Sequence, residues 1–448
     1  MITMARMAHK HGSLLLLALG DFAFNLYWQS VMLFLLFYYT DALELPMAVA
    51  ATTLLVASVW DGIANFLAGV AVDRRRGRTR GYRAWLIAGA LPLGLSFVLV
   101  YAPPITSGWP GVAGVFVGHL LFRTAYAAVN VPYLATTARI SADSGDRAFL
   151  AGTRMLFGTA AAVLVSLGTV PIGGRLLGVE EPARAYLGAA ALFAVIGTVI
   201  LMLVGLSYRE AEAPEAPPPP SVRAALASLA ANRAFVTLTA AMMAMIVAVT
   251  ILNKSVLYYY RYFLHDDAGG QLALASMGVV SAVAVPLWML LAKPLGARGV
   301  WFAAAGLAMA GLALFAAVDL RSSGAAQLFL MFMQGAAMGL NFAFWAMLPD
   351  TIEWGERETG LRVEGAVFGV AALLGRVAIG VATAILGWSF GSAGYVANAE
   401  QSAGTLEAIR WTIALVPLGF LGLSCVFMRL NPLGRGVHDR VVRELAGA

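Results

Sequence analysis

The sequence contains few charged residues, and this scarcity excludes an ordinary water-soluble protein. Only 12% of its 448 residues are Asp, Glu, Lys or Arg, whereas 60% are hydrophobic and the mean hydropathy is +0.79. A water-soluble domain is typically about 25% charged, because its surface must be covered with polar groups. Much of the surface of this chain is therefore expected to face lipid.

The sequence also lacks the residues and motifs of common catalytic sites. Cys425 is the single cysteine, so the chain can form no internal disulfide. Histidines and carboxylates do not occur at metal-binding spacing, and there is neither a Gly-x-Ser-x-Gly motif nor a phosphate-binding loop. We therefore expect no enzyme activity, no cofactor and no metal site.

The positive charge of the chain does not indicate a nucleic-acid partner. The formal net charge is +6, but the arginines are concentrated in short segments beside hydrophobic runs. Such a distribution is typical of loops that flank membrane-spanning helices. We expect a lipid bilayer as partner and no nucleic acid.

Long hydrophobic runs predict membrane-spanning helices. Backbone amides in hydrocarbon must be hydrogen-bonded within the protein, so a spanning chain forms helices or a closed barrel. Barrel strands would alternate over short stretches, whereas these runs continue for about 20 residues or more, enough to cross about 30 Å as helices. The sequence predicts an all-α membrane protein with twelve transmembrane helices. The expected spans are residues 13–39, 46–72, 84–102, 109–137, 149–176, 185–206, 233–260, 270–292, 299–318, 324–348, 363–390 and 406–428.

The middle of the chain divides these spans into two halves of six. Residues 207–232 contain three glutamates and the four prolines 217–220, a composition typical of a linker. We expect a six-helix bundle at 1–206, a cytoplasmic linker at 207–232, and a second six-helix bundle with a cytoplasmic tail at 233–448.

Loop charges predict the orientation in the membrane. Six arginines lie between residues 74 and 83, whereas the loops at 40–45 and 103–108 contain no Lys or Arg. Because positively charged loops stay in the cytoplasm, both termini and the linker are expected inside. The prediction is a multi-pass protein of the cytoplasmic (inner) membrane, functioning as a monomer.

Several charged residues lie inside the expected spans. Each costs at least about 2.5–3.5 kcal/mol at mid-membrane, so each needs a partner, a water-filled cavity or a function. These residues are Asp21, Asp61, Arg123, Arg154, Lys254 and Arg376.

Polar stripes accompany the charges of the first two spans. Asp21, Asn25 and Gln29 recur every four residues and so share one face of a helix. Asp61 and Asn65 lie one turn apart on the second span. The asparagine and glutamine side chains suit either substrate binding or hydrogen bonding between helices, which is worth about 1 kcal/mol each.

Later spans carry further candidates for substrate binding. His119, Arg123, Tyr126 and Asn130 share a face of the fourth span, which is too polar to point at lipid. In the second half, the candidates are Lys254, Asn341, Trp345 and Arg376. Arg376 alternatively forms a structural ion pair, and Lys254 alternatively extends toward the interface.

Short motifs throughout the chain resemble one known family. The motifs are Gly20-Asp21-Phe22, Tyr38-Tyr39-Thr40-Asp41, Trp60-Asp61-Gly62-Ile63, the run from Asp73 to Trp85, Tyr126 through Tyr133, Asp350 through Glu356, Glu364, and Gly394-Tyr395 with Asn398 and Gln401-Ser402. Together they resemble the glycoside–pentoside–hexuronide:cation symporters of the major facilitator superfamily. The resemblance implies two pseudo-symmetric bundles that rock around a central site in an alternating-access transporter of sugars or glycosides.

The resemblance also implies roles for particular residues. Asp21 and Arg154 match the family's acidic and basic sugar-binding residues, and Asn130 stands where some members have a second aspartate. The family's cation site has two carboxylates on the second helix with a lysine nearby. Here these positions hold Asp61, Asn65 and Arg376. Their charges sum to zero, and arginine keeps its proton, so we expect altered or absent Na⁺ coupling. Proton coupling through Asp21 or Asp61 is the open alternative, because a carboxylate in a cavity of low dielectric constant can bind a proton more readily.

Counting charges favours an acidic substrate. Four basic residues face two acidic ones inside the spans, an excess of 4 − 2 = +2. We expect Asp61 to pair with Arg376 and Asp21 with Arg154, which leaves Arg123 and Lys254 for a carboxylate or sulfonate. A hexuronide-like glycoside is preferred to a neutral sugar. An alternative is a lysophospholipid or another anionic amphiphile.

Overall fold

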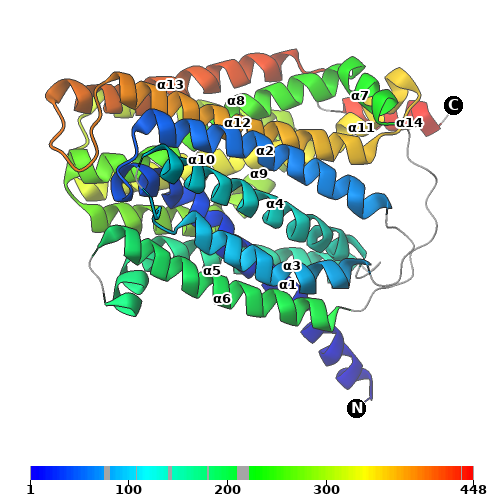
Figure 1. The fold of residues 1–448 in the computed structure, drawn as a ribbon. Helices are drawn as coiled ribbons and strands as arrows, with labels where there is room; N and C mark the ends of the chain where they lie inside the picture. The colour runs from blue at the N-terminus through cyan, green and yellow to red at the C-terminus, as the bar shows by residue number, and fades with distance from the viewer. Residues whose placement is uncertain are drawn as a thin grey trace. The chain divides into compact units, whose positions relative to one another are not determined.

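The structure is a computed structural model that describes residues 2–74, 81–106, 108–139, 144–178, 181–208, 221–434 and 436–446. Every regular element within these ranges is a helix (Figure 1). The chain divides into two compact units, Met1–Ala216 and Pro217–Ala448. The prediction of an all-α membrane protein is confirmed.

The first unit contains six long helices. They are α1 (Ile2–Phe37), α2 (Met47–Arg74), α3 (Gly81–Val100), α4 (Trp109–Arg139), α5 (Ser144–Leu177) and α6 (Pro182–Ser207). Helix α1 packs against α5 and α6, α2 packs against α4, and α3 packs against α4 and α6. Two contacts position the site described below: α1 against α5, and α2 against α4.

The second unit repeats this packing and adds short helices. Its elements are α7 (Val222–Ala231), α8 (Arg233–Tyr258), α9 (Asp267–Ala317), α10 (Ser323–Met347), α11 (Asp350–Thr359), α12 (Glu364–Ser392), α13 (Ala403–Leu430) and α14 (Val437–Ala446). Helix α8 packs against α12 and α13, as α1 packs against α5 and α6. Helix α9 packs against α10 and α13.

Helix α9 accounts for two of the expected spans. Its 51 residues would extend for about 77 Å as one straight helix, more than twice the hydrocarbon thickness. At Gly296 the backbone leaves the helical conformation, with φ 71° and ψ 162°, which strongly favours glycine. Eleven helices of the described residues are long and apolar enough to cross a membrane. Because α9 is interrupted at Gly296, it counts as two spans, and the eleven helices account for the twelve expected spans.

A short π-helix ends the first long helix of each unit. The element η1 (Tyr38–Ala42) follows α1, and η2 (Tyr259–Leu264) follows α8. Both are followed by a residue with positive φ, Glu44 and His265, each at 54°. Such turns contain i→i+5 hydrogen bonds and are uncommon, so their occurrence at corresponding places indicates a shared backbone design.

The expected linker contains a helix that the sequence analysis did not predict. Ser221 caps the N-terminus of α7 by accepting a hydrogen bond from the backbone nitrogen of Ala224 at 3.3 Å. The hydroxyl groups of Ser228 in α7 and Thr359 in α11 lie 2.8 Å apart. Residues 209–220, with the proline cluster, and the arginines of residues 75–80 lie outside the described residues.

Candidate functional site

The central feature of the first unit is an ion pair between Asp21 of α1 and Arg154 of α5. The guanidinium binds in a bidentate manner: its Nε donates to Oδ2, and its Nη2 donates to Oδ1 at 3.1 Å. The pair remains partly open, because the side chains of Asp21 and Arg154 are 16% and 25% exposed. The expected pairing is therefore present, in a form that a small molecule can reach.

Tyr133 of α4 completes this group and is not among the site residues predicted from the sequence. Its hydroxyl lies 2.6 Å from Oδ2 of Asp21 and 2.7 Å from the carbonyl oxygen of Leu17, two acceptors for its single proton. A Cβ atom at Gly20 would lie 2.5 Å from the Tyr133 ring, so glycine permits this close approach. In the sequence, the motifs Gly20-Asp21 and Asn130 through Tyr133 are the pattern that indicates Tyr133 as a site residue. We call Asp21, Tyr133 and Arg154 the Asp21 cluster.

The polar stripe of α1 is hydrogen-bonded along its own helix. The Nδ2 of Asn25 donates to the carbonyl oxygen of Asp21 at 2.9 Å. The Nε2 of Gln29 donates to Oδ1 of Asn25 at 3.3 Å. Asn25 therefore lies directly beside the Asp21 cluster, with part of its hydrogen-bonding capacity already used.

A second ion pair joins Asp61 of α2 to Arg123 of α4, and it corrects one expectation. The Nη1 of Arg123 lies 3.5 Å from Oδ2 of Asp61, and the two side chains are only 3% and 0% exposed. Arg123 therefore has an acidic partner in its own unit, contrary to the expectation that it lacked one. Asn65 donates to Oδ1 of Asp61 at 3.1 Å.

Two neighbouring groups hold the Arg123 side chain from other directions. Its Nε donates to Nε2 of His119 at 3.1 Å, one helical turn earlier. Its Cζ lies 5.3 Å from the centroid of the Trp28 ring, within the range of a cation–π contact. The hydroxyl of Tyr39 lies 3.5 Å from Nδ1 of His119. We call Asp61, His119 and Arg123 the Asp61 cluster.

Tyr126 and Asn130 lie on α4 between these clusters. The Tyr126 ring is buried against aromatic rings, with centroid distances of 5.6 Å to Phe24, 5.9 Å to Trp28 and 5.8 Å to Phe122. Asn130 is half-buried one turn later. Tyr126 thus contributes to an aromatic core, and its contact with substrate stays a prediction.

The candidates of the second unit are dispersed over three helices. Lys254 is buried in α8, and Arg376 is half-buried in α12. Asn341 and Trp345 lie exposed one turn apart on α10, and the indole of Trp345 is 52% exposed. The roles of these four residues are not tested by their positions alone.

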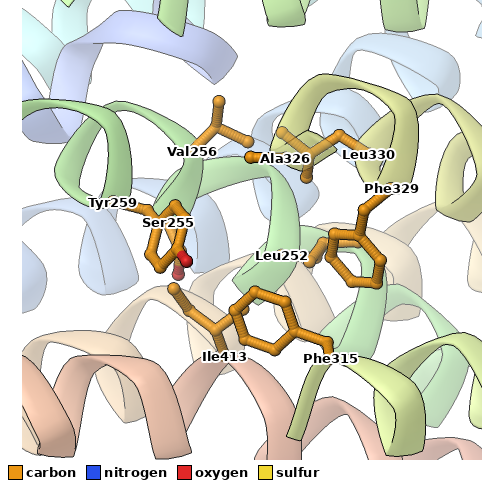
Figure 2. Close-up of a pocket in the computed structure, with 9 residues that line it drawn as sticks. All are labelled: Leu252, Ser255, Val256, Tyr259, Phe315, Ala326, Phe329, Leu330 and Ile413. Atoms are coloured by element: carbon orange, nitrogen blue, oxygen red, sulfur yellow. The ribbon is translucent and has the colours of Figure 1, made fainter. Parts of the chain in front are cut away.

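Figure 2 shows an apolar pocket in the second unit. It is lined by Leu252, Ser255, Val256, Tyr259, Phe315, Ala326, Phe329, Leu330 and Ile413. Its two hydroxyl groups already bind backbone carbonyls: Ser255 donates to Ile251 at 2.7 Å, and Tyr259 donates to Leu320 at 2.7 Å. This pocket offers a sugar few hydrogen bonds.

The acidic motif of α11 has a structural explanation. Arg362, between α11 and α12, contacts Glu356 at 2.8 Å, Glu364 at 2.7 Å and Glu353 at 3.3 Å. Hydrogen bonds to Glu356 and Glu364 raise the pKa of Arg362 above its ordinary value. These residues therefore fix a loop. Among the described residues, no group of three or more His, Cys, Asp and Glu side chains is arranged to hold a metal ion.

Comparison with known proteins gives consistent matches along the chain. The family model described as "MFS/sugar transport protein" matches residues 16–435. The "Glucuronide carrier protein homolog" of Escherichia coli is 29% identical over 96% of this chain and 94% of its own length. A "Putative sulfoquinovose importer" of Salmonella typhimurium is 28% identical over 91% of this chain and 87% of its own length. The solved structure of a D-xylose-proton symporter is similar in fold, with a TM-score of 0.61 at 16% identity, over 93% of this chain and 96% of that one.

Proposed function

Because the chain belongs to the MFS/sugar transport protein family, it is a membrane transporter and not an enzyme, and we propose that it carries an acidic glycoside such as a hexuronide. The observation that carries the sugar part of this proposal is the Asp21 cluster. It presents a carboxylate acceptor and a planar guanidinium donor side by side, both partly exposed. Such a pair suits the neighbouring hydroxyl groups of a sugar ring.

The distribution of charge supports an acidic substrate. In the first unit, Asp21 pairs with Arg154 and Asp61 pairs with Arg123, so these four charges cancel. Arg123 therefore no longer supports the acidic group, as the count from the sequence had suggested. Lys254 and Arg376 carry the positive charge inside the long helices α8 and α12 of the second unit. A negative substrate group would offset this charge in a membrane domain.

The names of the relatives agree with this choice. A glucuronide and sulfoquinovose are both sugars with an anionic group, and they appear in the names of two relatives. A neutral glycoside remains the second candidate, because the Asp21 cluster alone would bind its hydroxyl groups equally well. The alternative of a lysophospholipid is not favoured, because three of the relatives are named for carrying a glucuronide, isoprimeverose or sulfoquinovose. Substrate contacts by Asn25, Tyr126, Asn130, Asn341 and Trp345 stay predictions.

A competition assay tests the charge argument. Purified protein in proteoliposomes would be assayed for uptake of a labelled phenyl glucuronide in competition with unlabelled phenyl glucuronide or phenyl glucoside. One charge-assisted hydrogen bond is worth about 1.5–3 kcal/mol, so we expect the glucuronide to compete at least about tenfold better. Lys254→Gln should reduce this preference to about twofold or less.

Lys293→Gln is the matched control, because Lys293 is exposed on α9. We expect this variant to keep the preference of the unmodified protein. The acidic-substrate proposal would be wrong if the glucoside competes equally with the glucuronide. It would also be wrong if Lys254→Gln and Lys293→Gln behave alike.

We also propose that both termini lie in the cytoplasm, that the protein functions as a monomer in the inner membrane, and that Na⁺ stimulates transport little or not at all. In a Cys425→Ser background, cysteine at Ile105 should react with an impermeant thiol reagent on whole cells, because this loop residue is exposed. Cysteine at Leu361, in the exposed loop before α12, should react only after the cells are opened. The reverse pattern contradicts the orientation.

A further inference from the structure

The Asp61 cluster lies at the position where the sequence pattern suggests a cation site. Asp61 stands in the first carboxylate position of the sequence pattern that suggested a cation site, and Asn65 stands in the second. The carboxylate is completely buried, and both of its oxygens accept hydrogen bonds. An ionised carboxylate with this burial requires positive charge close by.

Arg123 provides that charge from within the protein. Its Nη1 contacts Oδ2 of Asp61 at 3.5 Å, and its Cζ lies 5.3 Å from the centroid of the Trp28 ring. A monovalent cation bound to Oδ2 of Asp61 would lie next to this guanidinium, which already contacts the same oxygen at 3.5 Å. Two like charges so close together in a buried site repel each other strongly. The residues present do not fit a bound cation.

His119 fixes the position of the guanidinium. Its Nε2 accepts a hydrogen bond from Nε of Arg123, so this ring nitrogen carries no proton. The only proton of the neutral ring is then on Nδ1, directed to the Tyr39 hydroxyl at 3.5 Å. A protonated imidazole would place one N–H against another. His119 is therefore a positioning residue that accepts from Arg123 and leaves Nη1 directed at Asp61.

We propose that Arg123 is a built-in counter-ion that takes the place of an external coupling cation at Asp61, with His119 holding it in position. This inference rests on the proposed function in one respect, since it assigns a cause to the weak or absent Na⁺ coupling. The chemical consequence is specific. Removal of the Arg123 side chain should leave a buried carboxylate site for a small monovalent cation, either Na⁺ or the guanidinium ion.

The test measures thermal unfolding of the full-length protein in detergent at constant ionic strength, with choline chloride as the reference salt. The melting temperature of the unmodified protein should be equal in sodium chloride and in choline chloride. Arg123→Gln should melt lower by about 5 °C or more in choline, because one charge of a buried pair is then alone. Millimolar guanidinium or added Na⁺ should recover at least half of this loss by binding the folded state.

Two further variants separate a counter-ion from a packing effect. Asp61→Asn combined with Arg123→Gln removes both charges and should abolish the response to Na⁺ and guanidinium. Arg123→Lys keeps a positive charge and should stay insensitive to both ions. His119→Gln, which retains an acceptor, should melt higher than His119→Phe.

Each outcome decides the proposal. Specific stabilisation of the unmodified protein by Na⁺ would overturn it, as would a folded Arg123→Gln variant that responds to neither ion. If Arg123→Gln cannot be purified, the proposal requires the neutral double variant to be purified in its folded form, and failure of both overturns it. The melting temperatures do not depend on substrate. Failure of glucuronide transport alone would therefore contradict the proposed function and leave this inference intact.

Discussion

The first long helix of each unit ends in a π-helix, and the two turns are built alike. The corresponding tyrosines are the same distance apart in sequence: 259 − 38 = 221 and 260 − 39 = 221. The backbone nitrogen of Leu45 donates to Tyr39, and that of Asp266 donates to Tyr260, both at 2.9 Å. The backbone design is thus repeated closely.

The interiors of the two units do not repeat each other in charge. In the first unit, two carboxylates and two guanidinium groups form two ion pairs within the helices. In the second unit, the ion pairs described involve α11, α14 and loops, while Lys254 and Arg376 lie in the long helices. The comparison teaches that similar helix packing accommodates ion pairs between long helices in one unit, and ion pairs at short helices and loops in the other.

The largest effect is expected when the open ion pair of the first unit is broken. Asp21→Asn should reduce substrate uptake by about 100-fold or more, because two charge-assisted hydrogen bonds between Arg154 and Asp21 are weakened and the substrate loses its carboxylate acceptor. Uptake would be measured in proteoliposomes with equal amounts of folded protein. The double variant Asp21→Asn/Arg154→Gln should recover stability and not transport. Uptake within about twofold of the unmodified protein would contradict this prediction.

Two tightly packed glycines should separate transport from stability. Gly20→Ala would push the Tyr133 ring away from Asp21, so we expect uptake to fall about tenfold. Gly339→Ala would meet the Trp288 ring of the second unit at 2.5 Å. Such overpacking should cost about 1–3 kcal/mol of stability while uptake per folded molecule is retained. Equal loss of uptake in the two variants would remove the functional difference between the units.

The repeated π-helices should contribute equally to stability. Tyr38 donates to the carbonyl oxygen of Tyr101, and Tyr259 donates to that of Leu320, each at 2.7 Å. Tyr38→Phe and Tyr259→Phe each remove one such hydrogen bond and should each lower the free energy of unfolding by about 1 kcal/mol. Denaturant unfolding in mixed micelles would measure both. A difference larger than about 1 kcal/mol would show that the turns are not equivalent.

The smallest effect is a pH dependence confined to the second unit. Hydrogen bonds from Ser323 and the backbone of Gly269 lower the pKa of Asp266 below 3.8, and this residue caps α9. An aspartate whose pKa is lower in the folded state contributes its full stability when the pH is above the unfolded-state pKa. This contribution is lost as the pH falls through the folded-state pKa. Asp266→Asn should therefore lower the melting temperature slightly at pH 6 and by a smaller amount at about pH 3. The corresponding residue of the first unit is Leu45, and Leu45→Asn should show no such change between the two pH values.

The spans could be predicted from the sequence because the bilayer imposes both length and hydrophobicity. The expected span 324–348 corresponds to α10, Ser323–Met347, and 233–260 contains α8, Arg233–Tyr258, with the first two residues of η2. The short helices α7, α11 and α14 were not predicted, since each has only ten residues and lacks a long apolar run. The π-helices were not predicted either. Hydrophobic periodicity over so few residues does not distinguish a π turn, with its one additional residue, from an α turn.

The candidate site was predictable only in part. The pairing of Asp21 with Arg154 followed from the resemblance, whereas the partner of Asp61 did not. Asp61 lies 61 − 47 = 14 residues after the start of α2, and Arg123 lies 123 − 109 = 14 residues after the start of α4. Equal depth made them possible partners, but only the packing of α2 against α4 selects this pair.

Each π-helix also affects how the chain can be aligned. A π turn contains one more residue than the α turn it replaces, and one residue changes the direction of all following side chains by about 100°. Deleting one residue from η1 would therefore rotate Tyr39 out of line with His119, although the composition of the segment would hardly change. An alignment of relatives that places a gap anywhere between residues 38 and 44 would assign the wrong neighbours to one helix face, so gaps there must be placed by three-dimensional structure.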